Sequence, residues 1–139
     1  MKQVEPKNKI ILLDVHAILH RAYHALPGFA TKDGRPTGAL YGLVSMIIKA
    51  VEDLKPDYIF ACYDLPAPTF RKKMYEEYKA HRPKTDTELI DQIKSSRSVF
   101  EAMNIPYFEK EGFEGDDLLG TLAEIFKKDE ASQIVIVSG

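Results

Sequence analysis

Apolar residues are arranged along the chain as short continuous runs that alternate with helically spaced stretches. Continuous runs occupy residues 9–13, 58–63, 104–108 and 134–137. Such runs are typical of strands buried on both faces of a sheet. Helical spacing covers residues 15–26, 38–54, 86–103 and 115–128, the third helix starting from Thr85 or Asp86 as N-cap. Strands alternating with helices predict a single α/β domain over residues 1–139, with a parallel sheet flanked by helices on both faces.

The segment 65–84 breaks this rhythm and is strongly basic. It contains three prolines, and within 70–84 six Lys or Arg stand against two Glu, whereas the whole chain has a net charge of -2. Tyr75 and Tyr78 lie among the basic residues. Cations beside aromatic rings suit a nucleic-acid strand, although a solvated charged helix is the commoner fate of such runs. Because the segment directly follows Asp64, we interpret it as a basic arch that binds nucleic acid.

Composition excludes several classes of protein. The single Cys62 rules out an internal disulfide and is compatible with a reducing compartment. The first residues are polar and lack the apolar region of a signal peptide. No stretch approaches the roughly 18 apolar residues that a membrane span requires. We therefore expect a cytoplasmic protein without a membrane partner.

Acidic residues gather where the predicted strands and the last helix meet. Asp14 and Asp64 each end an apolar run, and Glu114, Asp116 and Asp117 open the helix at 115–128. Carboxyl ends of parallel strands meet at one sheet edge, where ligands collect. Carboxylates there suit Mg²⁺ or Mn²⁺, and a pair of such ions can clamp and hydrolyse a phosphodiester.

A structural alternative exists for the acidic pair at the helix start. Asp116 and Asp117 could merely stabilise the helix N-terminus, at about 0.3–1 kcal/mol each. The metal site is favoured because Asp14 and Asp64 each directly follow an apolar strand, where packing gives no reason for a charged side chain.

Three histidines recur every four residues at positions 16, 20 and 24, a spacing that can place imidazoles on one helical face. The Glu of the zinc motif H-E-x-x-H is missing, since Ala17 follows His16. A partly solvated polar stripe is the favoured interpretation, and zinc is not expected.

Seven short motifs, in order and with matching spacing, resemble one known family. They are Leu-Leu-Asp (12–14), His-Arg-Ala-Tyr-His-Ala-Leu (20–26), Pro-Thr-Gly-Ala-Leu-Tyr-Gly (36–42), Lys-Pro-Asp-Tyr (55–58), Thr-Phe-Arg (69–71), Tyr-Glu-Glu-Tyr-Lys-Ala-His-Arg-Pro (75–83) and Glu-Gly-Phe-Glu-Gly-Asp-Asp-Leu (111–118). The combination resembles the N-terminal 5′–3′ exonuclease domain of bacterial DNA polymerase I, in the flap-endonuclease group of the PIN-like fold.

The resemblance implies a role for each matching residue. It implies hydrolysis of DNA that carries 5′ ends or flaps, with a two-ion Mg²⁺ or Mn²⁺ site in the complete domain. The implied metal ligands are Asp14, Asp64, Glu114, Asp116 and Asp117. The implied catalytic residues near the scissile phosphate are Lys79 and Arg82, and the implied nucleic-acid contacts are Arg21, Arg71, Tyr78, Lys79 and Arg82.

The sequence departs from the family pattern at two places. Val15 and His16 stand where the family usually has Gly-Ser after its first aspartate. In relatives, the strand ending at Gly139 leads into an Asp-x-Asp and a helix-three-turn-helix segment. We therefore expect the N-terminal half of a nuclease domain, weak or inactive alone, whose partner would be the other half or a polymerase portion.

Three alternatives stay open at this point. The chain could be a stand-alone PIN-like ribonuclease with a one-ion site. It could be a non-catalytic fragment that binds nucleic acid through the basic arch, or an α/β domain whose acidic pairs are only helix caps.

Overall fold

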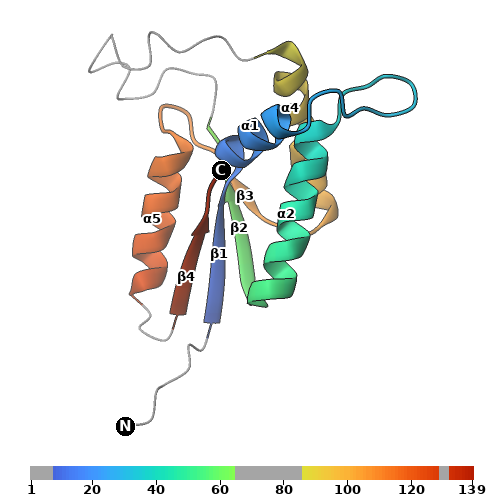
Figure 1. Cartoon of the computed structure of the whole chain (residues 1–139). Coiled ribbons are helices and arrows are strands. Elements are labelled where there is room, and N and C mark those ends of the chain that lie inside the picture. The colour runs from blue at the N-terminus through green and yellow to red at the C-terminus, as the bar shows by residue number, and fades with distance from the viewer. Residues whose placement is uncertain (1–7, 65–85, 129–131) are drawn as a thin grey trace.

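The computed structural model describes residues 8–64, 86–128 and 132–139 (Figure 1). Four strands form one parallel sheet in the order β3-β2-β1-β4. The strands are β1 (Asn8–Asp14), β2 (Tyr58–Cys62), β3 (Tyr107–Phe108) and β4 (Ser132–Val137). The helices are α1 (Val15–Ala25), α2 (Gly38–Leu54), α4 (Thr87–Ala102) and α5 (Gly115–Lys127).

Strand β1 lies between β2 and β4, and both of its faces are apolar. Ile10 and Leu12 pack in a cluster with Leu119 of α5, whereas Ile11 and Leu13 pack on the opposite face. Successive side chains of a strand point to opposite faces, so a run without polar residues requires cover on both sides. Helix α5 covers one face, and α1, α2 and α4 cover the other (Figure 1). The predicted parallel sheet with helices on both faces is confirmed.

The third strand is shorter than the pattern predicts. The expected range was 104–108, but only Tyr107 and Phe108 pair with β2. Asn104 has a φ of 56°, in the left-handed region, and follows the end of α4. Pro106 has no backbone N–H to give to a ladder, although its carbonyl accepts the Ala61 N–H at 3.0 Å. Residues 104–106 therefore form the reversal after α4, although the apolar run alone predicts that they belong to the strand.

Helix α4 begins after Asp86, one of the two N-cap residues expected from the sequence. The Asp86 carboxylate does not cap its own helix but accepts the Tyr23 hydroxyl at 3.0 Å. This hydrogen bond joins the beginning of α4 to the last half of α1. In the described part of the chain, no helix has the length and apolarity needed to cross a membrane.

Helix α2 is capped by a residue distant in sequence. Its N-cap residue Thr37 makes no side-chain capping bond. Instead, Oε1 of Gln92 accepts the backbone N–H groups of Ala39 at 2.8 Å and Leu40 at 3.2 Å. Gln92 comes from α4 and is only 3% exposed. Two otherwise unpaired donors of the first turn of α2 are therefore satisfied by a neighbouring helix.

Helices α1 and α2 approach closely at a glycine. A Cβ added to Gly42 would overlap the Cβ of Ala22, so only glycine fits at this crossing. We expect Gly42→Val to lower the free energy of unfolding by roughly 1–3 kcal/mol, because overpacking forces the helices apart. Urea denaturation followed by circular dichroism measures this change.

Gly120 provides the matched control, because a Cβ at this helical position in α5 would meet no atom within 4 Å. Gly120→Ala should raise the free energy of unfolding by about 0.5–1 kcal/mol through helix propensity alone. Equal stability of Gly42→Val and the wild type would contradict the close helix crossing.

Candidate metal site

Three aspartates from different elements meet at the carboxyl end of the sheet. Asp14 is the last residue of β1, Asp64 follows β2 by two residues, and Asp116 lies in the first turn of α5. The last residues of β4 reach the same end, beside the beginning of α1 (Figure 1). The parallel topology therefore brings together carboxylates separated by up to about a hundred residues of sequence.

Asp14 is half-buried and lies close enough to two other carboxylates to feel their charge. Burial raises the pKa of its carboxyl above the usual 3.8, and the charges of Asp116 and Asp64 raise it further. Hydrogen bonds from the backbone N–H of Ala17 at 3.5 Å and the hydroxyl of Ser138 at 3.2 Å offset part of this rise. Burial and the neighbouring carboxylates thus both disfavour the charged form of Asp14.

Asp64 is held between two helices. Its Oδ1 accepts the backbone N–H of Gly115, the first residue of α5. A Cβ at Gly115 would lie 3.1 Å from that oxygen, so glycine permits the close approach. The other oxygen, Oδ2, lies 4.0 Å from Nδ1 of His16 in α1. Both carboxylate oxygens of Asp64 thus face groups that restrict its rotation.

The residue before Asp64 is anchored in the core. Tyr63 is fully buried, and its hydroxyl lies 2.6 Å from the Ser96 hydroxyl. The guanidinium carbon of Arg97 lies 4.4 Å from the centre of the Tyr63 ring. Burial raises the pKa of Tyr63 to about 12, so its hydroxyl stays protonated. This anchor fixes the backbone from which the Asp64 side chain projects.

Glu114 and Asp117 take part in a capping box at the start of α5. Oδ2 of Asp117 accepts the backbone N–H of Glu114 at 2.8 Å. Glu114 is 4% exposed. In this conformation both residues stabilise the helix end, as the structural alternative predicted for Asp117. Their service as metal ligands stays a prediction.

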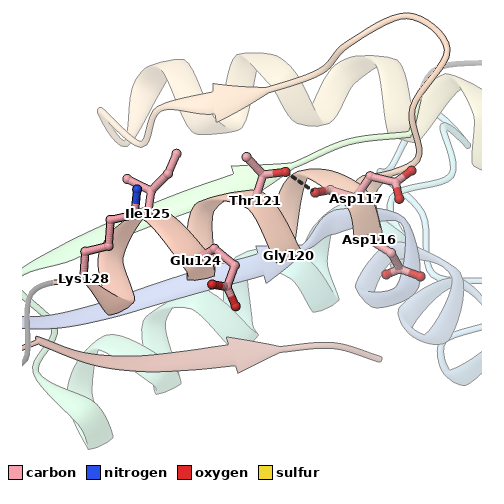
Figure 2. A pocket seen from close by; sticks show the side chains of 7 residues that line it. All are labelled: Asp116, Asp117, Gly120, Thr121, Glu124, Ile125 and Lys128. Atoms are coloured by element: carbon pink, nitrogen blue, oxygen red, sulfur yellow. Dashed lines mark hydrogen bonds between the residues drawn. The ribbon is translucent and has the colours of Figure 1, made fainter.

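Asp116 is exposed and borders a hollow on the outer side of α5 (Figure 2). Figure 2 shows Asp116 and Asp117 at the end of the helix toward which the strands run, with Glu124 and Lys128 farther along. The hydroxyl of Thr121 donates to the Asp117 carbonyl at 2.8 Å, which leaves the Asp117 carboxylate out of this contact. The charge of Asp116 contributes to the raised pKa of Asp14, which is due first to burial.

The donor chemistry fits a hard divalent cation, but the coordination shell is not preformed. Within residues 8–64, 86–128 and 132–139, no three His, Cys, Asp or Glu side chains are placed to hold one ion. The carboxylates of Asp14, Asp64 and Asp116 share one electrostatic environment, and oxygen donors of this type suit Mg²⁺ and Mn²⁺. A cation would relieve the repulsion that raises the pKa of Asp14.

The three histidines of α1 differ in their surroundings. His24 is exposed, as expected for a solvated stripe, whereas the His16 ring packs edge-on against Tyr63 at a centroid distance of 5.9 Å. Burial lowers the pKa of His16, and the charge of Asp64 partly opposes that effect. Sequence reasoning missed this contact, although the departure from Gly-Ser after Asp14 was a signal for it.

The predicted nucleic-acid residues are only partly within the described structure. Arg21 is exposed on α1, as a contact to a nucleic-acid backbone would require. Arg71, Tyr78, Lys79 and Arg82 lie outside the described residues, and so does the whole basic arch.

Comparison with protein families gives one match over nearly the entire chain. Residues 9–139 match the family described as 5′–3′ exonuclease, N-terminal resolvase-like domain. The sequence is 42% identical over 131 residues to DNA polymerase I of Caldicellulosiruptor bescii, covering 94% of this chain and 15% of that protein. It is 35% identical over 119 residues to a 5′–3′ exonuclease of Aquifex aeolicus, covering 86% of this chain and 41% of that protein.

Solved structures share the fold. The T5 D15 protein co-crystallised with metal ions superposes with a TM-score of 0.67 at 20% identity, covering 94% of this chain and 48% of that one. A complex of the T5 D15 flap endonuclease with DNA and metal ions has a TM-score of 0.62 at 18% identity, with the same coverage. The chain thus spans less than half the length of these relatives.

Proposed function

The chain belongs to the family of 5′–3′ exonuclease N-terminal, resolvase-like domains, and from this premise we propose that it serves in hydrolysis of DNA phosphodiesters at 5′ ends or flaps with Mg²⁺ or Mn²⁺. The observation that carries the proposal is the convergence of Asp14, Asp64 and Asp116. Three elements of the fold bring these carboxylates to one end of the sheet, where burial, and after it the charges of Asp116 and Asp64, raise the pKa of Asp14. Carboxylates gathered in this way favour a bound divalent cation.

Each residue has a distinct part in the proposed chemistry. Asp14, Asp64 and Asp116 would hold the cation, and Glu114 and Asp117 would contribute if the capping box opens. A bound divalent cation supplies a polarised water and neutralises phosphate charge. Lys79 and Arg82 would offset the charge that develops on the phosphate, and Arg21, Arg71 and Tyr78 would contact the DNA strand.

The relatives support this assignment at two points. The T5 D15 protein crystallises with metal ions, and another of its structures is described as a pseudo-enzyme-product complex with DNA and metal ions. The Aquifex relative is named a 5′–3′ exonuclease. We propose the same classes of cofactor and substrate here. Since this chain spans under half of the T5 and Aquifex proteins, we expect slow cleavage by the 139 residues alone.

The deciding experiment measures cation binding and DNA cleavage together. Mn²⁺ is titrated into the 139-residue chain, with free Mn²⁺ followed by electron paramagnetic resonance, and a 5′-flap DNA is then incubated with chain and Mn²⁺. We expect saturable Mn²⁺ binding and slow release of the 5′ flap. Both should be diminished in Asp116→Asn, even under conditions in which the variant is fully folded. Absence of saturable Mn²⁺ binding, or cleavage that survives EDTA and Asp116→Asn, would refute the proposal.

A further inference from the structure

The His16 side chain is 21% exposed, but one of its two ring nitrogens is buried and has no hydrogen-bond partner. Its Nε2 is buried and makes no hydrogen bond. A buried ring nitrogen without a hydrogen bond is unusual, so the surroundings of the other ring nitrogen are informative. The edge-on contact with Tyr63 fixes the ring plane, with an interplanar angle of 87°. The Tyr63 contact therefore restricts the orientation of the ring. In this orientation the other ring nitrogen, Nδ1, faces a charged group.

The other nitrogen faces a carboxylate of the candidate metal site. Nδ1 lies 4.0 Å from Oδ2 of Asp64, which is an ion-pair distance and too long for a direct hydrogen bond. A carboxylate beside one ring nitrogen favours the proton on that nitrogen. Nδ1–H then points its positive end at Oδ2, while the backbone N–H of Gly115 holds Oδ1. The two contacts come from α5 and α1 and involve different oxygens of the Asp64 carboxylate.

We propose that His16 is a positioning residue, which orients the Asp64 carboxylate for a divalent cation through the electrostatic attraction between Nδ1–H and Oδ2. The inference deepens the proposed function and rests on it, since the group that His16 orients is a candidate cation ligand. Partners that orient a metal ligand commonly change metal affinity by about 10–100-fold when removed. His16, one of the two residues that depart from the family's Gly-Ser, thus belongs to this site.

Two isosteric substitutions separate the two ring nitrogens. His16→Asn places an amide N–H near the position of Nδ1, whereas His16→Gln places one near Nε2. We expect the dissociation constant for Mn²⁺ to rise by about 10–100-fold in His16→Gln and His16→Ala, and to stay close to wild type in His16→Asn. His24→Ala, an exposed change on the same helix, is the control. Thermal unfolding of each variant identifies any loss of folded protein.

A second measurement reads the contact without a cation. Nitrogen-15 NMR of the His16 ring in cation-free protein should show the proton on Nδ1, and Asp64→Asn should shift that signal. If the wild-type chain binds no Mn²⁺, the proposed function fails, and the NMR result still decides whether His16 faces Asp64 as inferred. A proton on Nε2, an unchanged Mn²⁺ affinity in His16→Ala, or equal rescue by Gln and Asn would each overturn the inference.

Discussion

Asp14→Asn is expected to stabilise the cation-free chain at neutral pH and to remove the stabilisation that Mn²⁺ gives the wild type. Asn is as good an N-cap as Asp, so the contact to the Ala17 N–H survives the change. The substitution removes a charge that burial and the carboxylates of Asp116 and Asp64 disfavour. At a Mn²⁺ concentration of about 100 times the dissociation constant, the wild type should gain about 2.7 kcal/mol, and the variant little.

The pH dependence of this effect has a definite sign. The pKa of Asp14 is raised on folding from 3.8, so the cost of its charge is absent below that value. The cost develops as the pH rises through 3.8 and is complete above the raised pKa of the folded state. The free energy of unfolding of Asp14→Asn should therefore exceed that of the wild type increasingly as the pH rises, and the difference should disappear in acid.

Urea denaturation at several pH values, with and without Mn²⁺, measures both parts of this prediction. Asp91→Asn, which removes an exposed charge on α4, is the control and should show neither effect. A variant that is less stable than the wild type at neutral pH, or that keeps the full Mn²⁺ stabilisation, would contradict the role assigned to Asp14.

Gln92→Met is expected to lower the free energy of unfolding by about 2–4 kcal/mol, since it leaves two backbone donors without an acceptor. The Gln92 amide oxygen accepts both the Ala39 and Leu40 N–H groups at the start of α2. Met preserves most of the side-chain volume, so the loss reports the hydrogen bonds more than a cavity.

Amide hydrogen exchange locates the effect. The Ala39 and Leu40 amides should exchange much faster in Gln92→Met, because the first turn of α2 loses its acceptor. Lys94→Met on the exposed side of α4 is the matched control and should leave both amides protected. Unchanged exchange at these two positions would show that another group caps α2.

Local patterns were sufficient to predict the elements that the structure contains. Strand β1 and helix α2 follow from apolar spacing, because both the period and the burial of their residues are set within one segment. The end of the sheet at which Asp14 and Asp64 meet follows from parallel topology. Interactions across long separations were not predictable in the same way. No local signal announces that Gln92 caps α2, since its partners lie 52 and 53 residues away.

The candidate site was predicted in outline but not in detail. The spacing of Glu114 and Asp117 is equally compatible with metal binding and with a capping box, and the structure shows the second arrangement. The position of His16 against Asp64 depends on how α1 leaves β1, which the sequence does not specify. The strand within the 104–108 run starts late, at Tyr107, because left-handed backbone at Asn104 competes with strand formation.

The middle position of β1 has a consequence for the order of events during synthesis. One edge of this strand pairs with β2, where Ile11 faces Ile59, and the other pairs with β4, where Ile11 faces Val135. A nascent chain therefore carries β1 with one ladder unmade until residues 132–137 have left the ribosome. Contacts over such separations form slowly, and an unpaired apolar strand invites association with other chains. Early folding of this protein should accordingly benefit from chaperones that shield its first strand.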